Sequence, residues 1–587
     1  MNARSVSRNF AILVTCLLLA TSFGCAGSCS PGEPETGMDP DKTGGTATFG
    51  IAQDFETFNP LFATRAYTHD VLSQLYLSLM EEQDDYHEGP PTFKPQLAES
   101  WEVSPDGLVI TFFLRKDVVW SDGKKLTADD VVFSWKMQSD PELDWDGRDT
   151  KSSIKEVEMV DNHTVRFHFT HVYPYQLMDA NDGFILPARA WRPIPVKEWP
   201  TYDWSKKVVS NGPYLLDEYV PGEKVVLKAN PRYFEKGKPS IQKVIFRIFT
   251  DEDLLMEALL RRRIDLVLGV QAEHLDDLKR PPYKDFLEVG AVDGRSYAYI
   301  AWNTTRPPVE DRRVRRALTL AMNREAVVAG LWGGYAKVAS SPVHSSLWAH
   351  NQNLQPLPCD PEQAQALLAE AGWTDTDADG WLDKEGQRLT FELLTNESNP
   401  IRTQVAALLR DDLRKVGVQM VVRVLPYDEV IRLAHEHQFS ALLLTWRVGT
   451  QADLQMFHSN GIEQGYNYMG YQSAEVDRLI VEAEHEVDFK AAKPLWDRVQ
   501  QILYDDLPYT VLYESQQIYA VDKRIQGVVP HLELFSGLKD WWIAAADRNV
   551  TPLPEALEPV PEGTSASTPV AVSPAPSPAP SPAPRPQ

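Results

Sequence analysis

The sequence predicts an α/β protein of two or three globular units. At 587 residues the chain is too long for one ordinary hydrophobic core. Apolar segments typical of a strand, a helix and a second strand follow one another with short links at residues 243–249, 251–263 and 264–270. This order predicts parallel strands joined by a right-handed crossover.

The same order recurs later in the chain. A helix near residues 361–371 is bracketed by Asp360-Pro361 and by Gly372. The segments that follow it are strand 389–394, helix 401–416, strand 418–425, helix 427–437, strand 440–445, helices 474–487 and 491–504, and strand 509–513. We therefore expect a second β/α lobe with a largely parallel sheet.

An earlier stretch, residues 95–135, predicts a strand, a turn and a helix. A β-branched and aromatic run at 108–114 follows a Ser-Pro-Asp-Gly turn and is typical of a strand. Thr127 stands before Ala128-Asp129-Asp130, and a hydroxyl followed by two carboxylates suits the start of a helix.

The N-terminus predicts export. Arg4 and Arg8 precede an apolar run at residues 10–20, which is too short for a permanent transmembrane helix. Small residues then lead to Cys25, which we expect to be cut and acylated as in a bacterial lipoprotein. The residues before Cys25 depart from the usual lipobox, so secretion with ordinary cleavage is the alternative, and Cys29 is a second candidate for the lipid.

Charge and cysteine usage exclude several partners. The formal net charge of −25 repels nucleic acid and anionic lipid, so membrane contact is expected through the lipid anchor only. A bridge between Cys29 and Cys359 is not expected, because Cys29 would lie in a flexible leader. No residues are spaced like a zinc site, so we expect no metal and no cofactor.

Five stretches carry a resemblance to a known family. They are LAESW-x-VS-x-DG and LTA-x-DVVFS between residues 97 and 134, Asn211-Gly212-Pro213-Tyr214, Lys228-Ala229-Asn230-Pro231, DRRVRRALTLAMNRE from Asp311, and Gly470-Tyr471 with Glu475-Val476-Asp477. In this order they resemble family 5 extracellular solute-binding proteins, the peptide-binding class of ABC importer receptors.

The resemblance implies a clamshell like that of periplasmic binding proteins (class II, cluster C type), with two α/β lobes and an inserted domain. The expected division is a signal peptide at 1–25, a flexible tether at 26–45, first-lobe segments at 46–84, 206–297 and 505–549, the inserted domain at 85–205, the second lobe at 298–504, and a Pro/Ala/Ser-rich disordered tail at 550–587.

Candidate binding residues follow from the predicted sheet. Open α/β sheets bind ligands at the carboxyl ends of their strands, and in the second lobe these ends carry Asn396, Tyr427 and Trp446-Arg447. Trp446 offers a flat apolar wall and one N–H donor, and its alternative role is packing under a loop. Arg447 could clamp a carboxylate or phosphate, or form an exposed ion pair.

One position departs from the family pattern. In peptide receptors of this family a Trp-x-x-Asp segment supplies the carboxylate that meets the peptide's α-ammonium, whereas this chain has Gly449 at the matching place. The loss of that anchor leaves N-blocked peptides, sugars, opines and chelated metals open as solutes. Further aromatic candidates in loops or strand ends are Tyr67, Trp302, Trp332, Tyr466 and Tyr468.

Three other patterns have simpler explanations. Asp375-x-Asp377-x-Asp379-Gly380 resembles half of a calcium loop, but its twelfth position is Gly386 and lacks the bidentate glutamate, so we expect a solvated turn. His435-Glu436-His437 lacks zinc-protease spacing. The arginines at 261–263 could dock a membrane partner, although a solvated helix end is the ordinary reading.

The expected function is an exported, lipid-anchored and monomeric receptor in the periplasm or cell envelope. It captures a peptide or other small solute between two lobes and passes it to an ABC permease. The sequence shows no nucleophile elbow and no phosphate loop, so we expect no enzyme activity. One alternative is a solute sensor that signals without transport, and a neighbouring permease and ATPase gene pair would favour import over it. The other alternative is an enzyme with paired carboxylates in the cleft.

Overall fold

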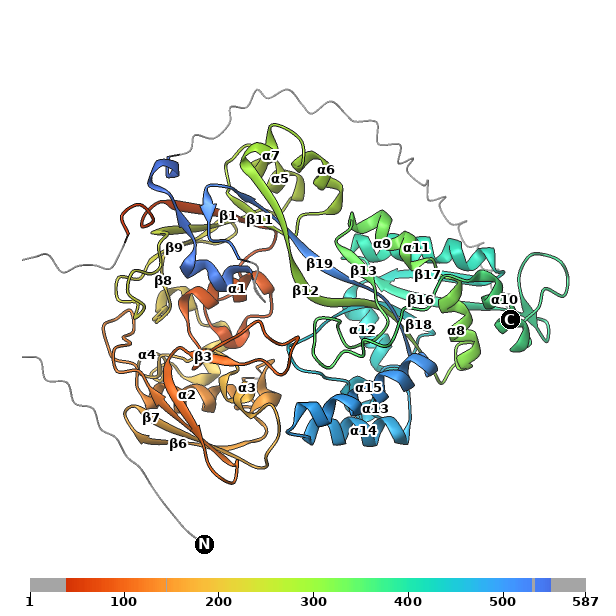
Figure 1. Ribbon diagram of the computed structural model, residues 1–587, viewed down its shortest axis with the longest axis horizontal. Coiled ribbons are helices and arrows are strands. Elements are labelled where there is room, and N and C mark those ends of the chain that lie inside the picture. Colours follow the sequence, from red (N-terminus) through yellow and green to blue (C-terminus); the bar gives the residue numbers. More distant parts are fainter. Residues whose placement is uncertain (1–38, 144, 530–533, 550–587) are drawn as a thin grey trace, which may run out of the picture.

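A computed structural model describes residues 39–143, 145–529 and 534–549 (Figure 1). Two lobes lie side by side, and two long strands run from one to the other, β12 (Leu287–Trp302) and β19 (Tyr509–Asp522). The predicted signal peptide with Cys25 and the C-terminal tail lie outside the described residues. Among the helices of the described ranges, none has both the length and the apolar character needed to cross a bilayer.

One mixed sheet of eleven strands continues through both lobes. Its order is β17-β16-β18-β12-β19-β11-β1-β10-β9-β8, and β13 also pairs with β19. The other strands of this sheet are β1 (Thr46–Ile51), β8 (Tyr214–Val220), β9 (Lys224–Ala229), β10 (Lys243–Ile248), β11 (Leu266–Leu268), β13 (Ala336–Val338), β16 (Thr390–Asn396), β17 (Gln419–Leu425) and β18 (Ala441–Arg447). The predicted α/β class is confirmed.

The remaining elements cover this sheet or form small sheets beside it. The helices are α1 (Ala66–Leu75), α2 (Ala128–Gln138), α3 (Gln176–Asn181), α4 (Ala188–Trp191), α5 (Glu252–Leu260), α6 (Leu275–Leu278), α7 (Tyr283–Phe286), α8 (Arg312–Ala321), α9 (Arg324–Trp332), α10 (Pro361–Glu370), α11 (Pro400–Lys415), α12 (Tyr427–His435), α13 (Gly461–Gln464), α14 (Ala474–His485) and α15 (Phe489–Asp506). The strand pairs are β2 (Met80–Glu82) with β3 (Phe93–Pro95), β14 (Asp383–Lys384) with β15 (Gln387–Arg388), and β20 (Ile525–Gln526) with β21 (Trp542–Ile543).

In the first lobe, β10 and β11 run parallel, as predicted, with α5 between them in the chain. They are not neighbours, because β1 lies between them and pairs with both. The local sequence pattern around β10 and β11 therefore could not show that β1, from much earlier in the chain, lies between them. On its other side, β11 pairs antiparallel with β19 and so joins the first lobe to the hinge.

A four-stranded antiparallel sheet lies beside the first lobe, with the order β4 (Ala98–Val103), β5 (Val109–Leu114), β7 (Thr164–Phe169) and β6 (Ile154–Asp161). Helix α2 packs on it and begins with a capping box, in which Thr127 and Asp130 each accept a hydrogen bond from the other's backbone N–H. The buried residues of this unit and of the first lobe form one continuous core. The two therefore stabilise each other directly.

In the second lobe, β17, β16 and β18 are parallel, and β18 pairs antiparallel with β12. Alternate residues of β12 enter two different cores. Tyr297 and Tyr299 pack on the face that α12, α14 and α15 cover, whereas Ile300 and Trp302 pack on the face that α8, α10 and α11 cover. The hinge strand is thereby fixed on both faces.

Candidate functional site

A polar network joins the carboxyl ends of β16 and β18. Asn396 ends β16, and its amide oxygen accepts a hydrogen bond from the guanidinium of Arg402 in the first turn of α11. Arg402 Nε also donates to Thr445 Oγ1 at 3.2 Å. Both partners are neutral side chains, and burial lowers the pKa of the guanidinium below its ordinary value. A partly buried positive charge at this edge of the sheet is suited to recognising an anionic group.

The residues predicted around Trp446 lie at the same sheet edge. Trp446 is half-buried, pairs in register with Tyr297 of β12 and packs against the second-lobe core. Arg447 and Gly449 are exposed just after it. A Cβ atom built at Gly449 would have no neighbour nearer than 4.0 Å. The loop therefore has space for a side chain at this position and does not use it.

The other predicted aromatic residues divide into two groups. Tyr427 and Tyr466 are exposed, and Tyr468 is half-buried with its ring 5.2 Å from that of His435. Trp332 is half-buried, 5.5 Å from the ring of Tyr513.

The remaining two are more enclosed. Tyr67 of the first lobe donates its hydroxyl to the Leu268 carbonyl at 3.1 Å. Trp302 is fully buried, and its indole N–H donates to Thr510 Oγ1 at 2.8 Å. The expectation that Trp302 is accessible to a solute is therefore wrong, and the residue packs in the core. The alternation of side chains along β12 is the physical reason.

The lobes contact each other across this edge. Thr450, in the loop after β18, donates a hydrogen bond to Glu82 Oε1 of β2 at 2.7 Å. The backbone N–H of Trp348 donates to the Tyr86 carbonyl at 2.9 Å. Burial raises the pKa of Glu82, while the Thr450 hydroxyl and the charge of Arg295 act in the opposite direction. Loops of the second lobe therefore contact the first lobe directly.

Arg295 comes from the hinge itself and was not predicted. It lies in a bulge of β12, where its φ of 41° is unusual for a residue other than glycine. Its carbonyl accepts a hydrogen bond from the Val448 N–H at 2.8 Å, and its charge acts on Glu82 and Tyr86. The bulge therefore places a second buried cation where the two lobes meet. Its only signal in the sequence is the preceding Asp293-Gly294 pair, which is typical of a turn.

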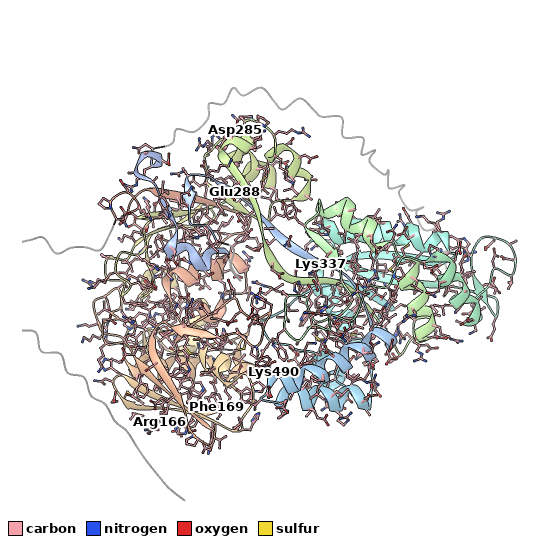
Figure 2. The ribbon with its side chains drawn as sticks, viewed as in Figure 1. Arg166, Phe169, Asp285, Glu288, Lys337 and Lys490 are labelled. Carbon is pink, nitrogen blue, oxygen red and sulfur yellow. The ribbon has the colours of Figure 1, made fainter. Side chains whose placement is uncertain are left out.

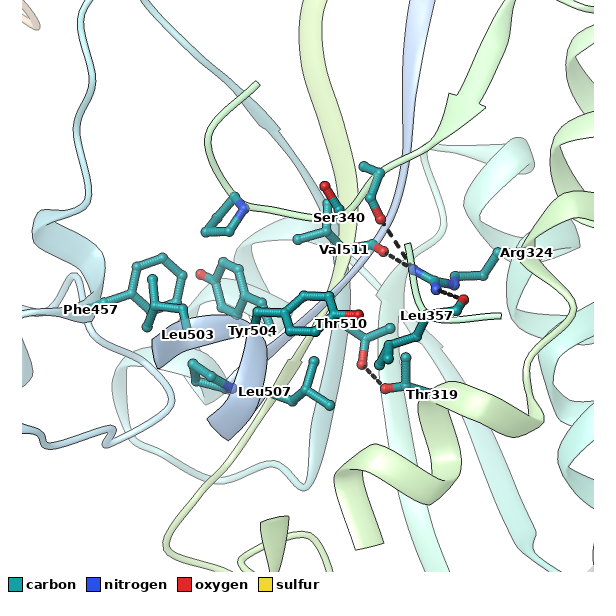
Figure 3. Close-up of a pocket in the computed structure, with 14 residues that line it drawn as sticks. Thr319, Arg324, Ser340, Leu357, Phe457, Leu503, Tyr504, Leu507, Thr510 and Val511 are labelled. Carbon is teal, nitrogen blue, oxygen red and sulfur yellow. Dashed lines mark hydrogen bonds between the residues drawn. The ribbon is translucent and has the colours of Figure 1, made fainter. Parts of the chain in front are cut away.

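Two further features are unsuited to hold a solute. A cavity of about 20 Å³ lies under Arg324, whose guanidinium donates to the carbonyls of Ala339, Leu357 and Val511 (Figure 3). Such a space accommodates about one water molecule. Burial lowers the pKa of Arg324 to about 10, and its three backbone contacts hold the loops around β13 together.

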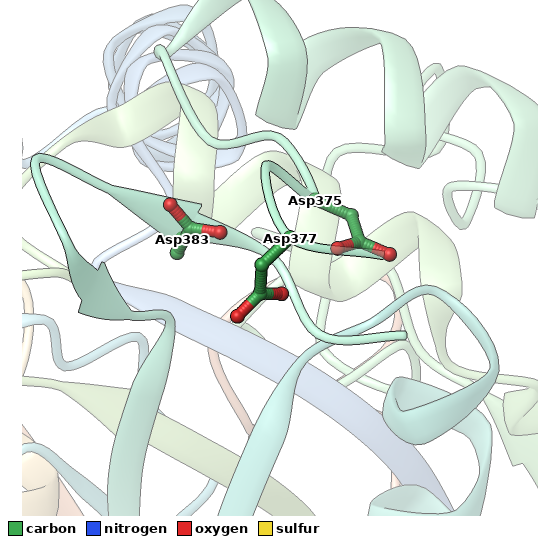
Figure 4. A group of neighbouring side chains, drawn as sticks. All are labelled: Asp375, Asp377 and Asp383. Carbon is green, nitrogen blue, oxygen red and sulfur yellow. The ribbon is translucent and has the colours of Figure 1, made fainter. Parts of the chain in front are cut away.

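The second is the predicted acidic turn. Asp375, Asp377 and Asp383 bring one carboxylate oxygen each within 4.8 Å of the others (Figure 4). Each carboxylate already accepts a hydrogen bond from within the turn: Asp375 from the Gly380 N–H, Asp377 from the Asp379 N–H, and Asp383 from Thr376. The arrangement is that of a solvated turn closed by its own side chains.

These features define a class of protein. Two α/β lobes joined by two strands meet at loops that leave parallel strands, and these loops carry aromatic rings and a cross-lobe hydrogen bond. Two cations, Arg402 of α11 and Arg295 of β12, lie beside them. This is the architecture of a receptor that encloses a small solute by hinge closure. Residues 92–504, more than half of the chain, match the family of bacterial extracellular solute-binding proteins, family 5, and the chain belongs to that family.

Relatives agree along nearly the whole chain. The oligopeptide-binding protein AppA of Bacillus subtilis (strain 168) is 28% identical over 542 residues, which cover 91% of this chain and 97% of that protein. The dipeptide-binding protein of Escherichia coli (strain K12) is 27% identical over 499 residues, covering 81% and 90%. The solved structure of Bacillus subtilis AppA with a nonapeptide matches with a TM-score of 0.71 over 86% of this chain and 100% of that chain, at 28% identity.

Proposed function

We propose that this protein is the substrate-binding receptor of an ABC importer and that it captures a peptide or peptide-like solute between its lobes. The observation that carries the proposal is Arg402, a partly buried guanidinium at the ends of two parallel strands whose hydrogen-bond partners among the described residues, Asn396 and Thr445, are both neutral. A peptide carboxylate is a suitable partner for such a group. The names of the relatives, which include oligopeptide- and dipeptide-binding proteins, support the same solute class.

The test begins with native mass spectrometry of freshly purified protein, which identifies any solute that is retained. Calorimetry then compares a defined peptide library with a library of sugars and opines. We expect binding to peptides alone, with the bound solute recovered at unchanged mass, since a receptor performs no covalent chemistry. Binding to sugars or opines without any binding to peptides would contradict the proposal.

A non-peptide solute is the second candidate, and one observation favours it. Gly449 takes the place at which peptide receptors of this family are expected to carry a carboxylate, and the space around its Cα is open. Restoring the acid with Gly449→Asp tests this. If peptide affinity rises, the cleft is built for peptides; if no peptide binds either form, the second candidate is favoured.

Import and anchoring complete the proposal. We infer that Cys25 carries the lipid and that a membrane permease receives the solute. Metabolic labelling with a fatty acid should mark the wild-type chain and not Cys25→Ser. Uptake of a labelled peptide should fall when the gene is deleted. Unchanged uptake together with retained binding would instead indicate a sensor.

A further inference from the structure

A second cavity lies at the hinge, apart from the strand-end network. It has a volume of about 200 Å³ and lies beside the bulge of β12, where this strand faces β19 and β13. Asp293 from β12, Glu514 from β19, Lys337 from β13 and His344 line it. Figure 2 shows Lys337 near the crossing of the two long strands, between the lobes. Four ionisable side chains from four segments therefore meet where the lobes hinge.

His344 has an unused polar atom in this cavity. The side chain is 2% exposed, and its Nδ1 is occupied by Ser346, whose hydroxyl lies 2.8 Å away. Its Nε2 is buried and has no hydrogen-bond partner among the described residues. That atom lies 3.5 Å from Asp293 Oδ1 and 3.7 Å from Glu514 Oε2, too far for a good hydrogen bond to either. A buried polar atom without a partner is costly, so a group is expected to fill the gap.

Glu514 is the more buried of the two acids. Its side chain is 4% exposed, and both its carboxylate oxygens accept hydrogen bonds from Ser345, one from the N–H at 2.8 Å and one from the hydroxyl. Lys337 Nζ lies 3.4 Å from Oε2, but the lysine side chain is 65% exposed. The carboxylate is thus fixed in place, while the lysine that approaches it remains open to solvent and free to be displaced.

An ammonium suits the polar groups of this cavity. Lys337 Nζ, itself an ammonium, already lies 3.4 Å from Glu514 Oε2. Asp293 Oδ1 and Glu514 Oε2 both lie within 3.7 Å of the same atom, His344 Nε2, so a cation beside that atom has two acids near it. An ammonium offers three donors, which matches two carboxylates and one imidazole nitrogen.

We infer that this hinge cavity is a subsite for a primary ammonium group of the bound solute, held by Glu514 and Asp293 with the imidazole of His344 as a third partner. The inference rests on the proposed function and makes it more specific. It supplies from the hinge strands the negative charge that is missing at Gly449. The solute class is then a peptide or peptide-like molecule with a free α-ammonium or lysyl ammonium, and N-blocked peptides are excluded.

The experiment compares a lysine-free peptide library with the same library after N-acetylation. Titration of the full mature chain by calorimetry should give a preference of roughly ten-fold or more for free amines. Glu514→Gln keeps an acceptor for Ser345 and should abolish this preference. Glu102→Gln is the matched control, because Glu102 is an exposed acid on β4, and it should leave the preference unchanged.

The outcomes separate the two proposals. If wild-type protein binds free and acetylated peptides equally, or if binding requires a divalent ion that EDTA removes, the ammonium subsite is wrong while the peptide receptor stands. If neither library binds, the proposed function itself fails. Should Glu514→Gln not fold, Asp293→Asn takes its place, since Asp293 is half-exposed and is expected to reduce the same preference.

Discussion

Thr450 and Glu82 are 368 residues apart in the chain, yet the threonine hydroxyl donates a hydrogen bond of 2.7 Å to the carboxylate. Thr450 belongs to the loop after β18 in the second lobe, and Glu82 to β2 on the side of the first lobe. The pair is a direct polar link between the two lobes. Burial raises the pKa of the Glu82 carboxyl and so favours its neutral form.

Thr450→Val should therefore weaken closure. Valine keeps the shape of threonine and removes the donor, which leaves the Glu82 carboxylate without its neutral partner. We expect solute affinity to fall by about five-fold, corresponding to roughly 1 kcal/mol, with a larger radius of gyration in small-angle scattering of the liganded protein. Thr450→Ser retains the hydroxyl and should behave as wild type. Equal affinities for the valine and serine variants would contradict the link.

Arg402→Gln should reduce binding through the solute carboxylate. The glutamine is neutral and shorter, so a charge-assisted contact is lost, and affinity for peptides with a free C-terminus should fall roughly ten- to a hundred-fold. Peptides with an amidated C-terminus should bind the wild type and the variant about equally. A similar loss for amidated peptides would mean that Arg402 maintains the loop at Asn396 and does not contact the solute.

Trp446→Ala tests the aromatic wall at the end of β18. Because the ring is half-buried, we expect its removal to cost about 1–2 kcal/mol of unfolding free energy and about ten-fold in solute affinity. Trp446→Phe keeps a flat ring and should recover most of both. Calorimetry and chemical denaturation measure the two quantities separately, and unchanged affinity in the alanine variant would remove Trp446 from the site.

Trp302→Ala should act on stability first. The ring is fully buried between β12 and α8, α10 and α11, and its loss also leaves the Thr510 hydroxyl without the indole donor. The expected cost is about 3–5 kcal/mol of unfolding free energy. Trp302→Phe should cost less, since it fills most of the volume. A stable alanine variant with weakened solute binding would restore Trp302 as a binding residue.

Glu484 makes stability depend on pH. Burial, with a further contribution from Asp453, raises the pKa of this carboxyl from 4.5 to about 7. Between these values the folded protein binds more protons than the unfolded chain, so this group's stabilising contribution is present below about pH 4.5 and is lost as the pH rises through 7. Glu484→Gln should therefore raise Tm by roughly 2–4 °C at pH 8 and leave it unchanged at pH 4. Calorimetric scans at both values check this, and a Tm increase of the same size at pH 4 would contradict the assignment.

The elements of the second lobe were predicted closely from the sequence. The helix expected at 401–416 is α11, Pro400–Lys415, and the strand expected at 440–445 is β18, Ala441–Arg447. Apolar periodicity and capping residues act over a few positions, so the chain carries these signals locally. For the same reason Asn396 and Trp446 could be assigned to strand ends, and Tyr427 to the start of a helix, before their neighbours were known.

The hinge could not be predicted in this way. Residues 287–302 contain Gly290 and the sequence Asp293-Gly294, which read as turns, yet they form β12, the longest strand of the described chain. The strand exists because β19 pairs along it and β18 pairs with its second half. Arg295, Glu514 and His344 were missed as site residues because each acquires its role from a partner far away in sequence.

The sequence by itself determined the class of fold, the family and the order of strands and helices, since these depend on composition, short-range pattern and a long ordered resemblance. Only the tertiary structure decided which side chains are buried in a core and which line a cavity. Alternation along β12 places Trp302 in a core and Asp293 beside a cavity, and which face of a strand becomes interior depends on the elements that cover it. Those covering elements come from residues hundreds of positions away, so their effect is absent from any local reading of the chain.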